Sequence, residues 1–232
     1  QYREDLGLWL ELAAGHVPPG QALLDVGAGT GRVSLPLARA GHRVVALDSD
    51  QELLAELARR SAGLPVQTVC ADARDFDLGD LTFPLIVVPM QTIQLLGGEA
   101  AHARFFGGAR RHLAEAGLVA VAIAASADFE EFDWEDGGRV PLPDVVELAG
   151  RAYFSQPTAV RRLADTFVLE RRREIVEPDG ARAGSDQRIA LDIVSTDELE
   201  RAAARAGLHP RGRRRIAPTE EHIGSDVVIV GA

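Results

Sequence analysis

Residues 23–32 read Leu-Leu-Asp-Val-Gly-Ala-Gly-Thr-Gly-Arg, and residues 44–48 read Val-Val-Ala-Leu-Asp. The pattern is an apolar strand, a turn with alternating glycines, a helix, and a second apolar strand that ends on an acid. Glycines in such a turn let the backbone approach a ligand closely, because no Cβ stands in the way. The terminal acid, Asp48, is placed to accept hydrogen bonds from a ribose diol. We therefore predict a βαβ unit that binds a nucleoside.

The spacing of the glycines narrows the choice of nucleoside. The dinucleotide fingerprint G-x-G-x-x-G needs a glycine at position 32, where this chain has Arg32, and the third glycine is Gly31. A pyrophosphate is also attracted to the positive end of the following helix. Here an acid, Asp25, precedes the first glycine by two residues, which suits a cationic ligand. S-adenosylmethionine (SAM) fits this pattern, because it carries a sulfonium, an ammonium, a ribose and an adenine but no phosphate.

Further motifs follow in a fixed order along the chain. They are Asp25-x-Gly27-x-Gly29-x-Gly31, then Asp48, then Ala71-Asp72-Ala73-Arg74-Asp75, and apolar strands at 85–88 and 118–123. In these residues the chain resembles the class I SAM-dependent methyltransferases. The resemblance covers residues 1–125 and returns near the C-terminus.

The resemblance implies an α/β fold with a doubly wound, mostly parallel seven-stranded sheet and helices on both faces. Strands and helices that alternate with short turns favour the same architecture. After residue 125 the pattern changes to polar–apolar alternation at about 151–163, 165–177 and 187–193, which predicts an antiparallel β insertion after the fifth strand. We expect a SAM-binding core at 1–125, an insertion at 126–194 that covers the substrate, and a last helix and strands at 195–232 that complete the core sheet.

Local signals predict several helix boundaries and core residues. Capping boxes at 49–52 and 195–198 predict helices at 50–60 and 196–206. A helix is also expected at 31–40, although it contains Pro36, which lacks a backbone donor. Trp9 is expected in the core. The single cysteine, Cys70, cannot form an internal disulfide and is expected to be a small buried apolar residue.

The resemblance assigns the cofactor to residues at the C-terminal ends of the strands, where open α/β sheets bind ligands. The glycine turn holds the methionyl portion, Asp48 takes both ribose hydroxyls, and Asp72 accepts from the adenine amino group. The full predicted cofactor set is Asp25, Gly27, Ala28, Gly29, Gly31, Asp48, Ser49, Asp72, Ala73, Met90 and Gln91. Plainer interpretations are a tight turn without a ligand, a helix cap at Asp48 and a solvated turn acid at Asp72.

Residues that contact the acceptor are harder to predict. Gln94 follows the fourth strand, where this family meets the transferring methyl group, and Trp134 and Tyr153 lie in the insertion. A structural role in packing is an equal alternative for each of them. His222 is a weak candidate for a general base. No histidine has metal-ligand spacing with another ligand, so no metal site is predicted.

Composition limits the partners. With 232 residues, 46% of them hydrophobic, the chain forms one large domain or a domain with an insertion. The net charge of −10 argues against a nucleic-acid partner, and the arginine runs at 171–173 and 213–215 are interpreted as solvated faces. The sequence contains no apolar run of 18 or more residues, so no membrane span is predicted. Cysteine usage points to the cytoplasm. The chain begins without methionine, so we expect residues to precede Gln1.

These observations predict a methyltransferase that moves a methyl group from SAM to an N or O atom of a small-molecule acceptor. The product is S-adenosylhomocysteine, and the rate enhancement comes mainly from proximity and orientation. The alternatives are a protein substrate, a non-catalytic SAM-binding regulatory module and a nicotinamide-dependent oxidoreductase, which Arg32 disfavours. The oligomeric state is left open, with a homodimer among the alternatives.

Overall fold

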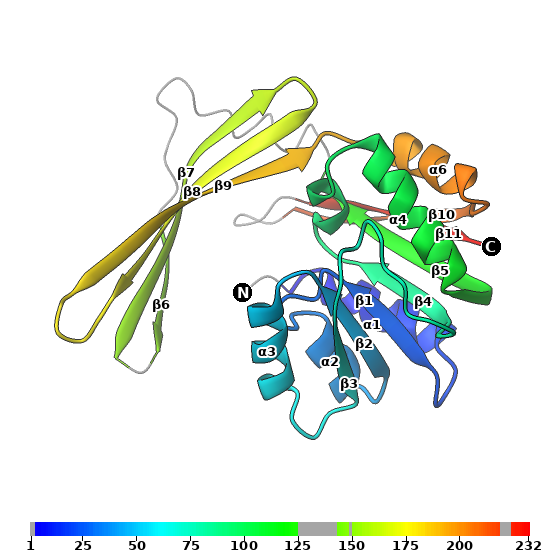
Figure 1. Ribbon diagram of the computed structural model, residues 1–232, viewed down its shortest axis with the longest axis horizontal. Coiled ribbons are helices and arrows are strands. Elements are labelled where there is room, and N and C mark those ends of the chain that lie inside the picture. Colours follow the sequence, from blue (N-terminus) through cyan, green and yellow to red (C-terminus); the bar gives the residue numbers. More distant parts are fainter. Residues whose placement is uncertain (1–2, 125–142, 149, 219–223) are drawn as a thin grey trace. The chain divides into compact units, whose positions relative to one another are not determined.

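The computed structural model describes residues 3–124, 143–148, 150–218 and 224–232. The chain divides into two compact units (Figure 1). The first, which we call the core unit, comprises residues 1–125 and 194–232; the second, which we call the sheet unit, comprises residues 126–193. Within the described part of the chain, no helix has the length and apolar character needed to cross a membrane.

The core unit is built on a seven-stranded sheet in the order β10-β11-β5-β4-β1-β2-β3. The five strands from β5 to β3 in this order are parallel, β11 is antiparallel to β5, and β10 is antiparallel to β11. This confirms the predicted mostly parallel sheet. In chain order the strands are β1 Ala22–Val26, β2 Arg43–Asp48, β3 Val66–Cys70, β4 Phe83–Val88, β5 Leu113–Ile123, β10 His209–Ile216 and β11 Ser225–Gly231.

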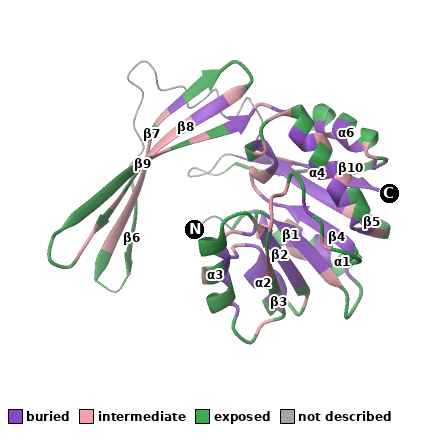
Figure 2. Cartoon of the chain, in the orientation of Figure 1, coloured by how far each residue is buried: buried purple, intermediate pink, exposed green. Residues whose placement is uncertain are grey.

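Helices cover both faces of this sheet, as predicted. Residues of α1, α2 and α3 pack with one set of strand residues, and residues of α4 and α6 pack with the other. The alternating side chains of the strands thus supply two apolar layers, which are coloured as buried in Figure 2. The helices are α1 Leu6–His16, α2 Ser34–Arg39, α3 Gln51–Arg60, α4 Glu99–Arg111 and α6 Thr196–Arg205, with a short 3-10 helix, η1, at Thr92–Leu95.

Two helix starts differ from the prediction. Helix α2 begins at Ser34 instead of residue 31, which places Pro36 in the first turn. The N–H groups of the first turn have no partner within the helix, so the N–H that proline lacks costs no intrahelical hydrogen bond. Helix α3 is capped by Asp50, whose Oδ1 accepts from the N–H groups of Glu52 and Leu53. The predicted capping box at Ser49 is therefore wrong. The one at Ser195 is confirmed, with Glu198 completing it.

The burial of Trp9 was predicted correctly, and that of Cys70 was not. Trp9 is fully buried in the core, as expected. Cys70 is exposed, because β3 is an edge strand of the sheet and Cys70 lies at its end. The expectation of a buried cysteine was therefore wrong.

The sheet unit is a four-stranded antiparallel sheet in the order β6-β7-β8-β9. Its strands are β6 Asp144–Leu148, β7 Arg151–Leu163, β8 Thr166–Val176 and β9 Arg182–Asp192. This confirms the antiparallel β insertion after the fifth strand of the core. Strand β9 starts earlier than the predicted 187, and β6 was not predicted, because its five exposed residues carry no long alternation.

Candidate functional site

The site is formed where the strand order of the core sheet reverses. Strands β1 and β4 lie side by side, and the chain leaves them toward opposite edges of the sheet. In open α/β sheets, ligands bind in the crevice beyond the carboxyl ends of the strands at such a point. The turn after β1 is held there by two backbone bonds, from the N–H groups of Gly27 and Ala28 to the carbonyl of Leu47, at 2.8 and 3.1 Å.

The three glycines of the turn have different surroundings. All three have a positive φ, which favours glycine. A Cβ on Gly27 would lie 2.4 Å from the Thr92 side chain, and one on Gly31 would lie 2.3 Å from that of Leu57. A Cβ on Gly29 would meet no atom within 4 Å. Gly27 and Gly31 thus permit close packing inside the protein, whereas Gly29 leaves open space above the turn.

Asp48 faces this open space from the end of β2. Its Oδ2 accepts from the N–H of Gly29 at 2.8 Å, and its Oδ1 accepts from the N–H of Asp50 at 3.0 Å. Each carboxylate oxygen has a second lone pair, so both can still accept from hydroxyl groups. Because Asp50 caps α3, the helix-cap alternative for Asp48 does not apply. Asp48 therefore fixes the turn and keeps acceptor capacity for a diol.

Asp25 adds a buried carboxylate beneath the turn. It is 1% exposed, and its Oδ2 accepts from the Ser34 hydroxyl at 2.5 Å. Among the residues described, its Oδ1 has no hydrogen-bond partner. Burial raises the pKa of Asp25 to about 6, although the Ser34 hydrogen bond and the charge of Arg32 oppose that rise. A buried acceptor without a partner is unusual in proteins and suits a cationic or N–H donor from a ligand.

Arg32, which occupies the position of the missing fingerprint glycine, anchors the first helix to the turn. Its guanidinium donates to both carboxylate oxygens of Asp5 at 2.5 and 2.7 Å. The indole N–H of Trp9 donates to the same carboxylate at 2.8 Å. Sequence reasoning missed this cluster. Its only local signal is the spacing of Asp5 and Trp9, which lie four residues apart and so share a helix face.

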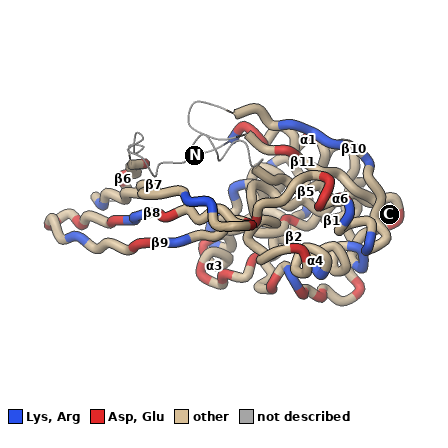
Figure 3. Tube along the Cα trace, turned by 90° about the horizontal axis from the view of Figure 1, so that it is seen from above, with Lys and Arg blue, Asp and Glu red and all other residues tan. Residues whose placement is uncertain are grey.

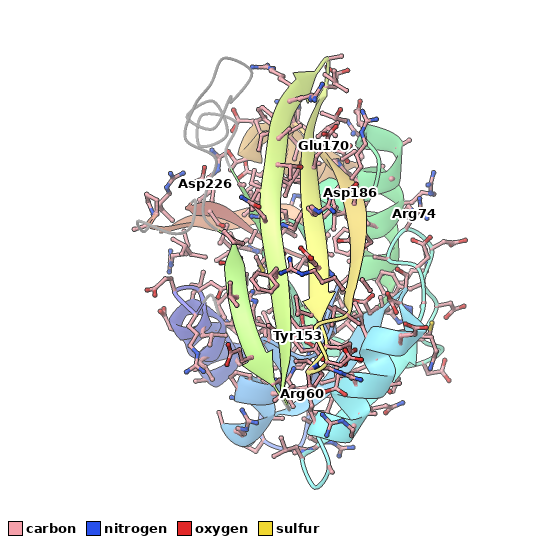
Figure 4. All side chains as sticks on the ribbon, turned by 90° about the vertical axis from the view of Figure 1, so that its left-hand side faces the viewer. Arg60, Arg74, Tyr153, Glu170, Asp186 and Asp226 are labelled. Carbon is pink, nitrogen blue, oxygen red and sulfur yellow. The ribbon has the colours of Figure 1, made fainter. Side chains whose placement is uncertain are left out.

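Asp72 lies at the same edge of the sheet, in the loop after β3. The N–H of the neighbouring Ala71 donates to the Asp48 carbonyl at 3.0 Å, which joins this loop to the end of β2. Asp72 is half-buried and forms an ion pair with Arg74, whose position Figure 4 marks. Hydrogen bonds from Arg74 lower the pKa of Asp72 to about 2. Asp72 is thus a charged acceptor that already has one partner, with the backbone of Ala73 beside it.

The loop after β4 brings two more predicted residues to the crevice and gives a third a structural role. Met90 is half-buried and has a φ of +56°, in the left-handed region that a residue other than glycine rarely adopts. Gln91 is half-buried next to it. Gln94 is 1% exposed, and its amide bonds the N–H and carbonyl of Ala124 at 2.8 and 3.3 Å. It therefore joins η1 to the end of β5, the structural alternative that the sequence left open.

The remaining predicted residues are distributed as follows. Ser49 is exposed, and its carbonyl accepts from the Cys70 thiol at 3.7 Å. Tyr153 lies on β7 of the sheet unit. Trp134 and His222 lie outside the described residues, so their predicted roles stay predictions.

The sequence also matches known proteins. Residues 23–117 match a family model described as a methyltransferase domain. The chain is 32% identical over 111 residues to a cypemycin N-terminal methyltransferase from a Streptomyces species, a match that covers 48% of this chain and 45% of that protein. It is 41% identical over 68 residues to ribosomal RNA small subunit methyltransferase A of Deinococcus radiodurans, covering 29% of this chain and 23% of that one. The chain thus spans less than half the length of these curated relatives.

Solved structures with the same fold cover nearly the whole chain. A sugar N-methyltransferase from a Streptoalloteichus species has a TM-score of 0.75 at 22% identity and covers 99% of this chain and 87% of its own. An amino pentose methyltransferase from Micromonospora echinaspora, solved with SAM bound, has a TM-score of 0.70 at 22% identity and covers 99% and 91%. These likenesses confirm the fold that the sequence predicts.

Proposed function

We propose that this protein, whose residues 23–117 match a methyltransferase domain model, is a class I methyltransferase that transfers a methyl group from SAM to an N or O atom of a small-molecule acceptor. S-adenosylhomocysteine is the second product. The observation that carries the proposal is a pair of acidic acceptors near the ends of β1 and β2. Among the described residues, the buried Oδ1 of Asp25 has no partner, and Asp48 holds the N–H of Gly29 beside the open space above that residue. This arrangement fits a ligand with a cationic group and a ribose but no phosphate.

Different residues of the site bind different parts of the cofactor. Asp25 receives the ammonium group on its unpartnered oxygen, and the open space at Gly29 admits the methionyl chain. Asp48 accepts from both ribose hydroxyls while its bond to the Gly29 N–H keeps the turn in place. Asp72 accepts from the adenine amino group, and Met90 and Gln91 border the cofactor after β4. When bound, SAM supplies an activated methyl group on its sulfonium.

The acceptor needs mainly orientation. Alignment of the acceptor atom with the S–CH₃ bond supplies much of the barrier reduction, roughly 7–11 kcal/mol in favourable intramolecular reactions. A general base is required only where the acceptor must lose a proton, and His222 is the residue proposed for that role. Trp134 and Tyr153 are kept as predicted acceptor contacts. The net charge of −10 and the similarity in fold to methyltransferases of sugars favour a small molecule over a nucleic acid.

Binding of S-adenosylhomocysteine tests the proposal. Asp48→Ala is expected to weaken this binding by at least about tenfold in calorimetry, because two charge-assisted hydrogen bonds are lost. Asp50→Ala is the matched control: it removes the neighbouring carboxylate, which caps α3, and is expected to bind within about twofold of the wild type. Unchanged affinity in Asp48→Ala would disprove the ribose assignment. Tighter binding of NADH than of SAM would disprove the function.

A further inference from the structure

The two faces of the sheet unit carry arginines in different surroundings. Residues directly opposite each other in an antiparallel pair lie on the same face, and successive residues alternate between faces. One face, which we call the paired face, carries four arginines among the described residues. Three of them form ion pairs with acids, and the fourth, Arg188, is opposite Glu170 in the register. The pairs are Arg161–Glu170 at 3.7 Å, Arg172–Asp186 at 3.8 Å and Arg182–Glu174 at 3.2 Å. Figure 4 marks Glu170 and Asp186 on β8 and β9.

The opposite face, which we call the open face, contains Arg171 and Arg173 in the middle of β8. In the register of the sheet, Arg173 is opposite Ser155 and Ser185, and Arg171 is opposite Gln187. Within the described ranges, neither arginine forms an ion pair with a carboxylate. Arg171 donates from Nη1 to the Ser155 hydroxyl at 2.9 Å, and its buried Nε has no partner there. Basic and acidic residues along these strands are coloured in Figure 3.

The two other arginines of the open face are already engaged near the ends of the strands. Arg151 forms an ion pair with Glu177 at 2.8 Å. Arg162 lies over the ring of Phe167, at 5.8 Å from its centroid. Arg171 and Arg173 therefore stand out on this face, because their positive charges meet hydroxyl and amide groups instead of acids.

A hollow of about 580 Å³ lies over this part of the sheet. At one end it is lined by Arg173, Ser155, Ser185 and Gln187, and at the other by Val146, Tyr153, Ile175 and Ala183. The first group offers a guanidinium, hydroxyls and an amide, and the second offers an aromatic ring among aliphatic side chains. The Ser155 hydroxyl accepts from Arg171, so its own hydrogen remains available to another acceptor.

Two acids also line the hollow, and neither neutralises Arg173. Glu174 is paired with Arg182. Asp144 lies in the same row as Arg173 but two strands away, with Ser155 between them. Neighbouring strands are about 4.8 Å apart, so the two backbones are about 10 Å apart, and no ion pair joins the two side chains, both of which lie in the described part of the chain. Among the residues described, the guanidinium of Arg173 is thus left without an acid inside a partly apolar hollow.

We propose that this hollow binds an organic anion, a carboxylate or phosphate ester with an aromatic or apolar body. Arg173 and Ser155 contact the anion, Arg171 holds Ser155 in place and adds positive charge, and Tyr153 packs against the body. A guanidinium suits this task because its planar fork matches the oxygens of carboxylates and phosphates. That the anion is the methyl acceptor rests on the proposed function; the binding itself does not.

Direct binding to the full chain, without SAM or its product, tests this site. The probes are phenyl phosphate, phenylacetate and the uncharged benzyl alcohol, each titrated by NMR. We expect both anions to bind more tightly than benzyl alcohol. Arg173→Gln is expected to weaken the binding of the anions by at least about tenfold, because hydrogen bonds between charged groups are lost. The matched control is Arg172→Gln on the paired face, which is expected to bind within about twofold of the wild type.

Two outcomes would overturn the proposal. One is equal binding of the anions and benzyl alcohol to the wild type, which would mean that the charge is not recognised. The other is equal loss in Arg172→Gln and Arg173→Gln, which would mean that only the overall charge of the sheet matters. A difference between phenyl phosphate and phenylacetate identifies the preferred anion. Because these titrations contain no cofactor, their result is independent of whether Asp48→Ala changes the binding of S-adenosylhomocysteine.

Discussion

The core unit and the sheet unit differ in how far their charged groups are buried. Around the glycine turn, Asp5 and Asp25 are almost fully buried, and Asp5 is held by Arg32 and Trp9. On the sheet unit, the paired arginines are largely exposed and lie 3.2 to 3.8 Å from their acids. The first arrangement fixes a shape in advance of binding. The second leaves side chains that can be exchanged with little effect on stability.

The energies of the two kinds of charge follow from their solvation. Breaking a buried ion pair costs about 3–5 kcal/mol, because the remaining charge stays buried without a partner. Exposed pairs contribute about 0–1 kcal/mol, since water and salt screen them. We therefore expect the cofactor turn to be sensitive to single substitutions. Single substitutions in the hollow of the sheet unit are expected to change which ligand it prefers but to leave the fold intact.

The largest effect is expected for Asp5→Asn. Asparagine has the same shape, and the Asp5 side chain makes no capping hydrogen bond to α1. The substitution therefore removes the charge that faces Arg32 and one of the two acceptor oxygens of the carboxylate. We expect the free energy of unfolding, measured in urea, to fall by about 3–5 kcal/mol. Asp186→Asn breaks an exposed pair of the sheet unit and is expected to cost less than about 1 kcal/mol. Similar losses in the two variants would remove the contrast between the units.

Much of the fold could be predicted because patterns within short, continuous segments of the sequence indicate it. The glycine turn and Asp48 form one continuous βαβ segment, and strands β7 and β8 show long alternation. The failures are also local. Ser49 and Asp50 are adjacent polar residues that can both cap α3, and a pattern cannot decide which of them does. Cys70 has the neighbours of a buried strand residue, but its exposure depends on β3 being at the edge of the sheet.

The parts of the site that could not be predicted depend on contacts between distant residues. The bond between Asp5 and Arg32 joins residues 27 positions apart. Nothing in the sequence indicates that Ser34 satisfies only one oxygen of Asp25. Likewise, the arginine run at 171–173 was interpreted as a single solvated face. The strand register divides it, because Arg172 is paired with Asp186 on one face while Arg171 and Arg173 lie on the other.

The second prediction concerns Asp25→Asn and its dependence on pH. Burial raises the pKa of Asp25 from 3.8 to about 6, so between these values the folded state keeps a proton that the unfolded state loses. Wild-type stability therefore falls as pH rises from about 4 to 6, and the uncharged asparagine of the variant cannot contribute to this fall. The stability of the variant relative to the wild type should rise by on the order of 3 kcal/mol between pH 4 and pH 7. Urea unfolding at both pH values measures this.

The same substitution separates stability from binding. Asp25→Asn is expected to weaken the binding of S-adenosylhomocysteine at pH 7, because the charge that faces the ammonium group is lost. Asp72→Asn is the control for the pH effect: the pKa of Asp72 is 3.8 in the unfolded state and about 2 in the folded state, so both values lie below pH 4. Its stability relative to the wild type should change by at most a few tenths of a kcal/mol between pH 4 and 7. A variant Asp25→Asn with the wild-type pH dependence would mean that Asp25 is charged throughout.

The third prediction, Gly29→Ala, has a smaller expected effect on stability than Asp5→Asn or Asp25→Asn, and it distinguishes a strained position from a binding position. Gly29 has a φ of +53° and open space around its Cα, so alanine adds conformational strain of about 1–2 kcal/mol and no clash. Gly180, in a turn of the sheet unit, has a φ of +86° and equally open surroundings. The two alanine variants should therefore lose similar stability. Only Gly29→Ala should also lose affinity for S-adenosylhomocysteine in calorimetry, because its methyl group enters the space that the cofactor needs. Equal affinities would show that the open space above the turn is not where the ligand lies.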